Sequence, residues 1–292
     1  MAVRSAAIGL TTEPQIRDIT PRQLLAYAAG IGATSPRYLD DAAATEMVAH
    51  PAFCVVLEWP ATLALRQHPQ FQLPHEEALR AVHAEQDSIF HRPIRPGDCL
   101  QTVATLIQVR RITPGAYTVT KLATVDAATQ EPVVTSYAST IYRGVPIEGP
   151  DTQVDTAPPP PAAPPQATWS HQVTMPVSRE APYVYTECAQ IWNPIHTERR
   201  VALAAGLPDI ILHGTATWAL AATQLIHGCA GGEPTRLQRL VGRFAAMVIP
   251  GTTITLHYGV APEAQQIVRY TVCNAEGAPA IDQGMAVLIP SA

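Results

Sequence analysis

The sequence predicts an α+β fold made of two similar halves, and three observations support this prediction. A proline-rich stretch, residues 156–166, interrupts the 292-residue chain and contains six prolines. Such a stretch fits neither a helix nor a central strand and favours an extended spacer. In each half, helix-like patterns come first and strand-like alternation follows. Each half also carries a proline turn and, later, a Pro-Gly turn in the same order.

The repeated turns indicate that one fold was duplicated. Pro36 and Pro194 mark the first turn of each half, and Pro96-Gly97 and Pro250-Gly251 mark the second. Apolar residues recur with a period near two after each Pro-Gly, which is typical of antiparallel strands. An ordered repeat of this kind indicates two copies of one structural unit. The predicted boundaries are 1–150 for the first half, 151–168 for the proline-rich linker and 169–292 for the second half.

The order of helices and strands agrees with this division. Thr20-Pro21 is a favourable helix start, and Gly206 is a favourable helix end. Helices are expected at 21–32, 52–68, 180–190, 199–205 and 213–228. Strands are expected at 84–91, 98–111, 115–127, 132–143, 236–246, 252–260, 266–274 and 281–289. Helices followed by antiparallel strands in each half predict an α+β layer architecture.

Composition excludes several classes of function. The net charge is −5, Lys121 is the only lysine, and no basic stripe is present, so no nucleic-acid partner is expected. No run of about 18 apolar residues occurs, so no membrane span is expected. The first ten residues do not resemble a secretory signal, and the five scattered cysteines do not form a zinc or disulfide pattern. These features favour a cytoplasmic protein, and the low charge favours a large apolar interior.

Neither a metal nor a cofactor is expected. His83, Glu85 and Asp87 alternate, so they would share one face of a strand, but no further ligand follows at a suitable spacing. The glycine-rich segment 228–232 fits neither the dinucleotide-binding nor the phosphate-loop pattern. The Gly-x-Ser-x-Gly pattern of serine hydrolases is also absent from the sequence.

The segment 183–218 carries the pattern that points to chemistry. Asn193-Pro194 forces a turn, and His196 follows directly. His213-Gly214 stands at the start of a long alanine-rich helix, whose first amides attract developing negative charge. Gly214 has no side chain and would let a carbonyl group approach such an amide. A histidine beside an oxyanion-binding amide suits proton transfer on an acyl thioester.

The sequence resembles the MaoC-like dehydratases, the (R)-specific enoyl-CoA hydratase family of the double hot-dog fold. In the second half, the resemblance rests on 192–198, Ala202, Gly206 and 211–214. The first half is similar to the non-catalytic N-terminal hot dog of the peroxisomal hydratases at 25–33, 82–86 and 90–94. The resemblance implies that each half is a long helix wrapped by an antiparallel sheet. It also implies an acyl thioester of coenzyme A or of a carrier protein as substrate, and a homodimer.

The resemblance assigns roles to residues of the second half. His196 would be the acid/base, Asn193 would orient groups of the site, and the amide of Gly214 would stabilise the oxyanion. Ile191 and His213 would contact the substrate. The family has an aspartate five residues before the motif histidine, and Ile191 stands there in this chain. Isoleucine cannot accept a proton.

Three readings of the function therefore remain open. The first is a hydratase or dehydratase (a lyase) in which His196 acts without the aspartate. The second is a catalytically altered or inactive hot-dog protein that binds acyl thioesters. The third is another reaction, a thioesterase or a biosynthetic dehydratase, in which Glu187 or Tyr185 acts beside His196. Glu187 lies one helical turn before Ile191, so it would share that face of a helix.

Overall fold

The structure is a computed structural model that describes residues 1–43, 46–159, 169–261 and 264–290. Each of the five predicted helices is confirmed, and Thr20 caps the first through reciprocal hydrogen bonds with Gln23. The α-helices are α1 (Pro21–Gly30), α2 (Pro36–Leu39), α3 (Cys54–Gln67), α4 (His75–Ala78), α5 (Ala181–Ala189), α6 (Arg199–Ala204) and α7 (Gly214–Cys229). Short 3₁₀ helices are η1 (Ser5–Ala7), η2 (Pro51–Phe53), η3 (Pro194–His196) and η4 (Pro234–Arg236).

The eight predicted strands are confirmed as well. They are β3 (Ala81–Phe90), β4 (Cys99–Ile112), β5 (Gly115–Asp126), β6 (Pro132–Arg143), β10 (Leu237–Phe244), β11 (Thr253–Ala261), β12 (Ala264–Cys273) and β13 (Pro279–Leu288). The pattern analysis missed the short strands β1 (Val3–Arg4), β2 (Gln15–Asp18), β7 (Ile147–Glu148), β8 (Thr152–Gln153) and β9 (His171–Pro176).

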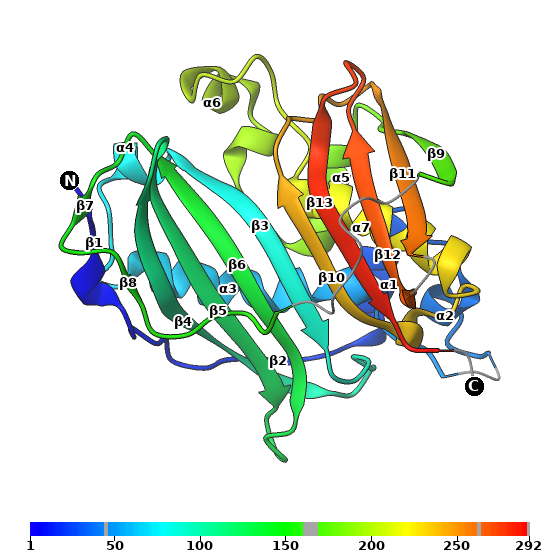
Figure 1. The fold of residues 1–292 in the computed structure, drawn as a ribbon. Coiled ribbons are helices and arrows are strands. Elements are labelled where there is room, and N and C mark those ends of the chain that lie inside the picture. The colour runs from blue at the N-terminus through cyan, green and yellow to red at the C-terminus, as the bar shows by residue number, and fades with distance from the viewer. Residues whose placement is uncertain (44–45, 160–168, 262–263, 291–292) are drawn as a thin grey trace.

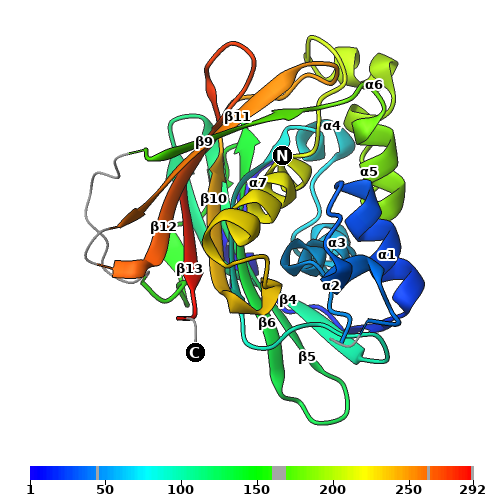
Figure 2. The ribbon, with the colours of Figure 1, turned by 90° about the vertical axis from the view of Figure 1, so that its right-hand side faces the viewer.

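The two halves join in one sheet whose strand order repeats. The order is β2-β4-β5-β6-β3 in the first half and, read from the other edge, β9-β11-β12-β13-β10 in the second. The halves meet through the antiparallel pair β3–β10, which holds the same place in each order (Figure 1). Helices α3 and α7 lie on the same side of this sheet, one for each half (Figure 2). This is the arrangement that a tandem hot-dog fold requires.

The Pro-Gly turns of the sequence repeat occupy equivalent places. Gly97 precedes β4 with φ +89°, and Gly251 precedes β11 with φ +84°. Other residues rarely adopt this conformation, so glycine at both turns has the same physical cause. The repeated topology and the repeated turns together support the duplication.

The halves are packed together rather than separated by a free spacer. One apolar core cluster runs from Ile19 in the first half to Leu288 in the second. In the predicted linker 151–168, β8 pairs with β4, and the Pro158 carbonyl accepts a hydrogen bond from Arg239 at 2.8 Å. Residues 160–168, with four of the six prolines, lie outside the described part of the chain.

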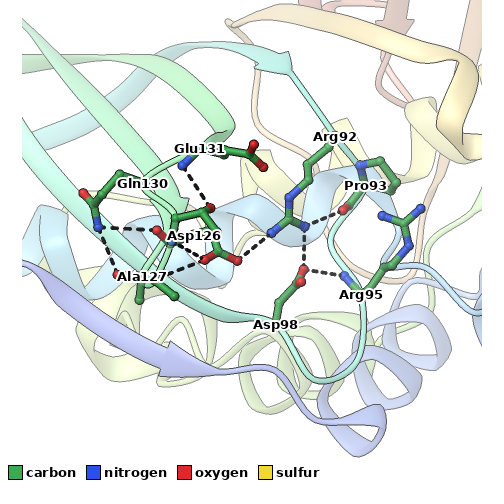
Figure 3. A network of polar contacts seen from close by, with 10 residues as sticks. Arg92, Pro93, Arg95, Asp98, Asp126, Ala127, Gln130 and Glu131 are labelled. Atoms are coloured by element: carbon green, nitrogen blue, oxygen red, sulfur yellow. Dashed lines mark hydrogen bonds and ion pairs between the residues drawn. The ribbon is translucent and has the colours of Figure 1, made fainter.

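A polar network fixes the connection between β3 and β4 at the end of the sheet (Figure 3). Arg92 donates to Asp98 at 2.8 Å and to Asp126 at 3.2 Å, so it ties this connection to the turn between β5 and β6. Asp98 also accepts from the Arg95 amide at 2.8 Å. Because these charged groups are already paired with one another, we assign the network a structural role.

Other features are reported for the described residues only. None of their helices is both long and apolar enough to cross a membrane. No group of three histidine, cysteine, aspartate or glutamate side chains among them could hold a metal ion. Of the residues considered for a metal, Asp87 pairs with Arg239, and His83 Nε2 lies 3.0 Å from the Glu85 carbonyl oxygen. All five cysteines are free.

Candidate active site

A cavity of about 1140 Å³ lies between the two halves, and residues of both line it. From the second half, its wall includes the predicted site residues Ile191, Asn193, His196, His213 and Gly214. From the first half, its wall includes Val55, Glu58 and Trp59 of α3, Gln86 of β3, and Thr118, Thr120 and Thr140 of β5 and β6. The structure therefore brings most of the predicted site residues to one cavity.

His196 is held in a defined protonation state. Asn193 caps η3, because its Oδ1 accepts from the Ile195 amide at 3.4 Å. The His196 Nδ1 lies 2.8 Å from the Ile211 carbonyl oxygen. A carbonyl oxygen can only accept, so Nδ1 carries the proton and Nε2 is the free acceptor. Burial lowers the pKa of His196 to about 4, so the ring is neutral at pH 7.

His213 packs directly on His196. The two ring centroids are 3.7 Å apart and nearly parallel, and His213 Nε2 lies 3.2 Å from the Thr186 hydroxyl oxygen. Burial, together with the neighbouring His196, holds the pKa of His213 well below its ordinary value. Two stacked neutral rings therefore stand at the cavity wall, and a proton on one ring disfavours a proton on the other.

The N-terminus of α7 supplies free backbone amides beside His196. The His213 carbonyl accepts from the amides of Ala216 and Thr217, so the amides of Gly214 and Thr215 precede the first of these bonds. Packing gives a second reason for glycine at position 214. A Cβ atom at position 214 would lie 2.9 Å from the Phe244 ring, so Gly214 is required by packing against that ring.

Ile191 lies where α5 ends. Gln190 caps the helix in the left-handed conformation with φ +55°, and the amides of Gln190 and Ile191 both donate to the Thr186 carbonyl. The Ile191 side chain is buried and borders the cavity. At this point the cavity wall is therefore apolar.

The two predicted substitutes for the missing acid lie elsewhere. Glu187 is exposed and lines a separate pocket of about 320 Å³ together with Trp192 and Asn193. Tyr185 is buried, its ring centroid is 4.9 Å from that of His213, and burial raises the pKa of its hydroxyl. Neither is among the described residues that line the cavity with His196. Their use beside His196 remains a prediction without geometric support.

The first half has residues at positions that correspond to those of this site. Ser35 caps α2 as Asn193 caps η3, and Tyr38 stands where His196 stands in the second half. His50 precedes η2 and α3 as His213 precedes α7, and its ring centroid lies 5.3 Å from that of Tyr38. Ala33 lies five residues before Tyr38, as Ile191 lies five residues before His196. Ala33, Tyr38 and His50 are all buried, and none borders the cavity.

The sequence analysis missed Glu58. Its carboxylate is buried at the cavity wall, and the side chain is 4% exposed. It is the only charged residue between Cys54 and Leu65, and apart from Thr62 its neighbours in this stretch of α3 are apolar. This isolation in the sequence is the signal that could have identified it. The low overall charge predicted a large apolar interior, but the cavity wall also includes polar side chains such as Glu58 and Gln86.

The fold and the cavity define a double hot-dog protein, and each half also matches a family of known domains. Residues 6–136 match the dehydratase domain region of FAS1-like proteins, and residues 161–277 match the MaoC-like domain. Over 291 aligned residues the chain is 26% identical to "3-hydroxyacyl-thioester dehydratase Y" of Mycobacterium tuberculosis, covering 96% of this chain and 95% of that protein. The second half of the chain therefore carries a MaoC-like domain, and the first half carries a domain similar to the dehydratase region of FAS1-like proteins.

Solved structures agree on the fold. A MaoC-like dehydratase from Phytophthora capsici superimposes with a TM-score of 0.81 at 22% identity, covering 96% of each chain. A Mycobacterium tuberculosis protein described as having a double hotdog fold superimposes with a TM-score of 0.64 at 17% identity, also covering 96% of each chain. The predicted tandem hot-dog fold is thereby confirmed.

Proposed function

We propose that this protein catalyses the reversible addition of water to a 2-enoyl thioester of the coenzyme A type. The observation that carries the proposal is the neutral His196, fixed through Nδ1 and placed on the same cavity wall as the free amides of α7. A base and an oxyanion-binding group at one cavity suit chemistry next to a thioester carbonyl. The full-length match to a 3-hydroxyacyl-thioester dehydratase also supports the proposal.

In the proposed mechanism, His196 moves the proton. Its Nε2 takes a proton from water as the water oxygen attacks Cβ of the enoyl group. The electron pair of the double bond moves onto the thioester oxygen, where the amides of Gly214 and Thr215 stabilise the charge. The protonated His196 then returns its proton to Cα, and the product is the 3-hydroxyacyl thioester. In the reverse direction the same steps remove water.

Ile191 is expected to lower the rate of hydration at this site. With an apolar side chain in place of the family aspartate, one histidine has to serve both proton transfers. Ile191→Asp would put a carboxylate on the cavity wall, and we expect it to raise the hydration rate by about tenfold or more. Ile191→Asn is the matched control, because asparagine is similar to aspartate in size and polarity but has no oxygen of comparable basicity.

A steady-state assay tests the proposal. The folded protein is incubated with crotonyl-, cinnamoyl- and mesaconyl-type thioesters, and loss of the conjugated double bond is followed by absorbance. We expect turnover that His196→Gln removes. Absence of turnover above buffer with every thioester, from the wild-type and the Ile191→Asp proteins alike, would refute it.

Ile191 also favours a second candidate function. The protein would then bind acyl thioesters without turning them over. Calorimetry with an acyl thioester and with free coenzyme A separates the two functions. Acyl-dependent binding without turnover would favour the binding protein.

A further inference from the structure

The cavity contains a buried acid that the proposed mechanism does not use. Glu58 lies in α3, and Val55 and Trp59 on the same helix also border the cavity. In the described part of the chain, no ion pair includes Glu58. A buried carboxylate without a cation is costly, so its presence in this buried stretch of α3 needs a physical reason.

Neutral side chains direct their donors toward this carboxylate. Gln86 Nε2 donates to Glu58 Oε2 at 2.9 Å, and the Ser136 hydroxyl donates to Oε1. Ser88 Oγ lies 2.9 Å from Gln86 Nε2 and 2.7 Å from Ser136 Oγ. Since Ser136 uses its hydrogen on Glu58, Ser88 donates to Ser136 and accepts from Gln86. Every donor in this network points to the carboxylate of Glu58, either directly or through a serine hydroxyl. This arrangement stabilises the ionised form of Glu58.

The acid has acceptor capacity to spare. An ionised carboxylate offers about four lone-pair sites; Gln86 and Ser136 occupy two of them, and the Cys54 thiol contacts a third. Desolvation by burial raises the pKa of Glu58, while its hydrogen bonds with Ser136, Gln86 and Cys54 oppose this rise. A further donor from a ligand in the cavity would therefore stabilise the charged form.

The side of the cavity formed by the sheet is also polar. Thr118, Thr120 and Thr140 border the cavity from β5 and β6, and all three side chains are buried. A plain hydrocarbon chain placed here would remove these hydroxyls and the carboxylate from water and return no hydrogen bonds. A chain with a polar substituent would make such bonds.

We propose that Glu58, with Gln86, Ser88 and Ser136, forms a subsite for a hydrogen-bond donor, a hydroxyl or an ammonium group, carried by the acyl chain of the substrate. The inference rests on the proposed function, since it takes the cavity as the acyl-binding site. It narrows the substrate class from enoyl thioesters in general to those with a donor group away from the thioester.

Binding of saturated thioesters tests the subsite apart from catalysis. Octanoyl-coenzyme A is compared by calorimetry with analogues that carry a hydroxyl or an amino group at one of the distal carbons. The wild-type protein should bind at least one analogue about tenfold or more tightly than octanoyl-coenzyme A, because a hydrogen bond to a buried charged group is strong. Tighter binding of the amino or of the hydroxyl series identifies the donor.

Variants locate the preference at the acid. Glu58→Leu should abolish it, and Glu58→Gln should keep part of a hydroxyl preference but none of an amino preference. If Glu58→Leu does not fold, Glu58→Gln and Ser136→Ala take its place in the test. Each should reduce the ratio between the affinity for the preferred analogue and the affinity for octanoyl-coenzyme A. Thr62→Val is the matched control, because Thr62 borders the same cavity one turn along α3 and takes no part in the network. It should retain the preference.

The outcomes separate the two proposals. Octanoyl-coenzyme A binding as tightly as every analogue, or a preference that survives Glu58→Leu and Glu58→Gln, would overturn the subsite and leave the hydratase proposal intact. No binding of any acyl-coenzyme A by the folded protein would overturn the subsite. Absence of enoyl turnover in the earlier assay, with donor-selective binding present, would overturn the hydratase proposal alone.

Discussion

At the scale of single residues, the protonation of His196 decides what the site can do. The Ile211 carbonyl fixes which nitrogen carries the proton, and burial keeps the ring neutral. A neutral imidazole has a free lone pair, so His196 is in the form that a base requires over most of the pH range. The motif around His196 made this residue predictable from the sequence. Glu58 was not, because its partners Gln86 and Ser136 come from two strands far along the chain.

The pH dependence of turnover follows from this state. Because the pKa of His196 lies at about 4, kcat/KM should stay constant from about pH 8 to about pH 5 and fall below that as the ring takes a proton. The measurement is a pH series of initial hydration rates. An unperturbed histidine would instead lose activity near pH 6.5, and that result would contradict the assigned burial.

At the scale of elements, the contact between α1 and α5 brings the helices of the two halves very close. A Cβ atom on Gly30 would lie 2.6 Å from Cys188 Cβ, so glycine is required there. The long elements were predictable because their apolar patterns are strong. The short strands β2 and β9 form the two outer edges of the sheet, and their alternation covers four and six residues. That is too short for periodicity to identify.

This close contact gives a stability prediction. Gly30→Ala should lower the free energy of unfolding by about 1–3 kcal/mol, because the added methyl group overpacks the interface. Urea unfolding monitored by circular dichroism measures the change. Adding Cys188→Gly to the same chain removes the opposing Cβ and should recover part of the loss. A Gly30→Ala protein as stable as the wild type would refute the tight contact.

At the scale of the whole molecule, the pair β3–β10 and one ion pair on it hold the halves together. Arg239 donates to both carboxylate oxygens of Asp87, at 2.8 and 2.6 Å, and both side chains are more than nine-tenths buried. His50 makes a second link between the halves. Its Nδ1 accepts from the Ala52 amide, so its Nε2 donates to Thr223 of α7 at 3.2 Å.

Breaking the buried pair should be costly. Asp87→Ala leaves the Arg239 charge buried without its partner, and we expect a loss of about 3–5 kcal/mol in the free energy of unfolding. The double variant Asp87→Leu/Arg239→Met removes both charges and should recover most of that loss. Chemical denaturation of the three proteins is the test, and equal stability of all three would contradict the assignment.

Stability should also fall in mild acid. Burial lowers the pKa of His50 to about 3 and that of His83 and His196 to about 4, so unfolded chains bind more protons than folded ones below about pH 6.5. The melting temperature should therefore drop steadily between about pH 6.5 and about pH 4. His50→Gln should show a shallower drop. A flat profile over this interval would rule out the buried neutral histidines.

The shared place of β3 and β10 in the two strand orders has a consequence for assembly. A chain with one repeat alone would leave this strand edge unpaired, and it would need a second copy to cover the edge. The pairing of two separate copies weakens on dilution, whereas pairing within one chain does not. Duplication thus makes completion of the sheet, and of the cavity that both halves line, independent of protein concentration.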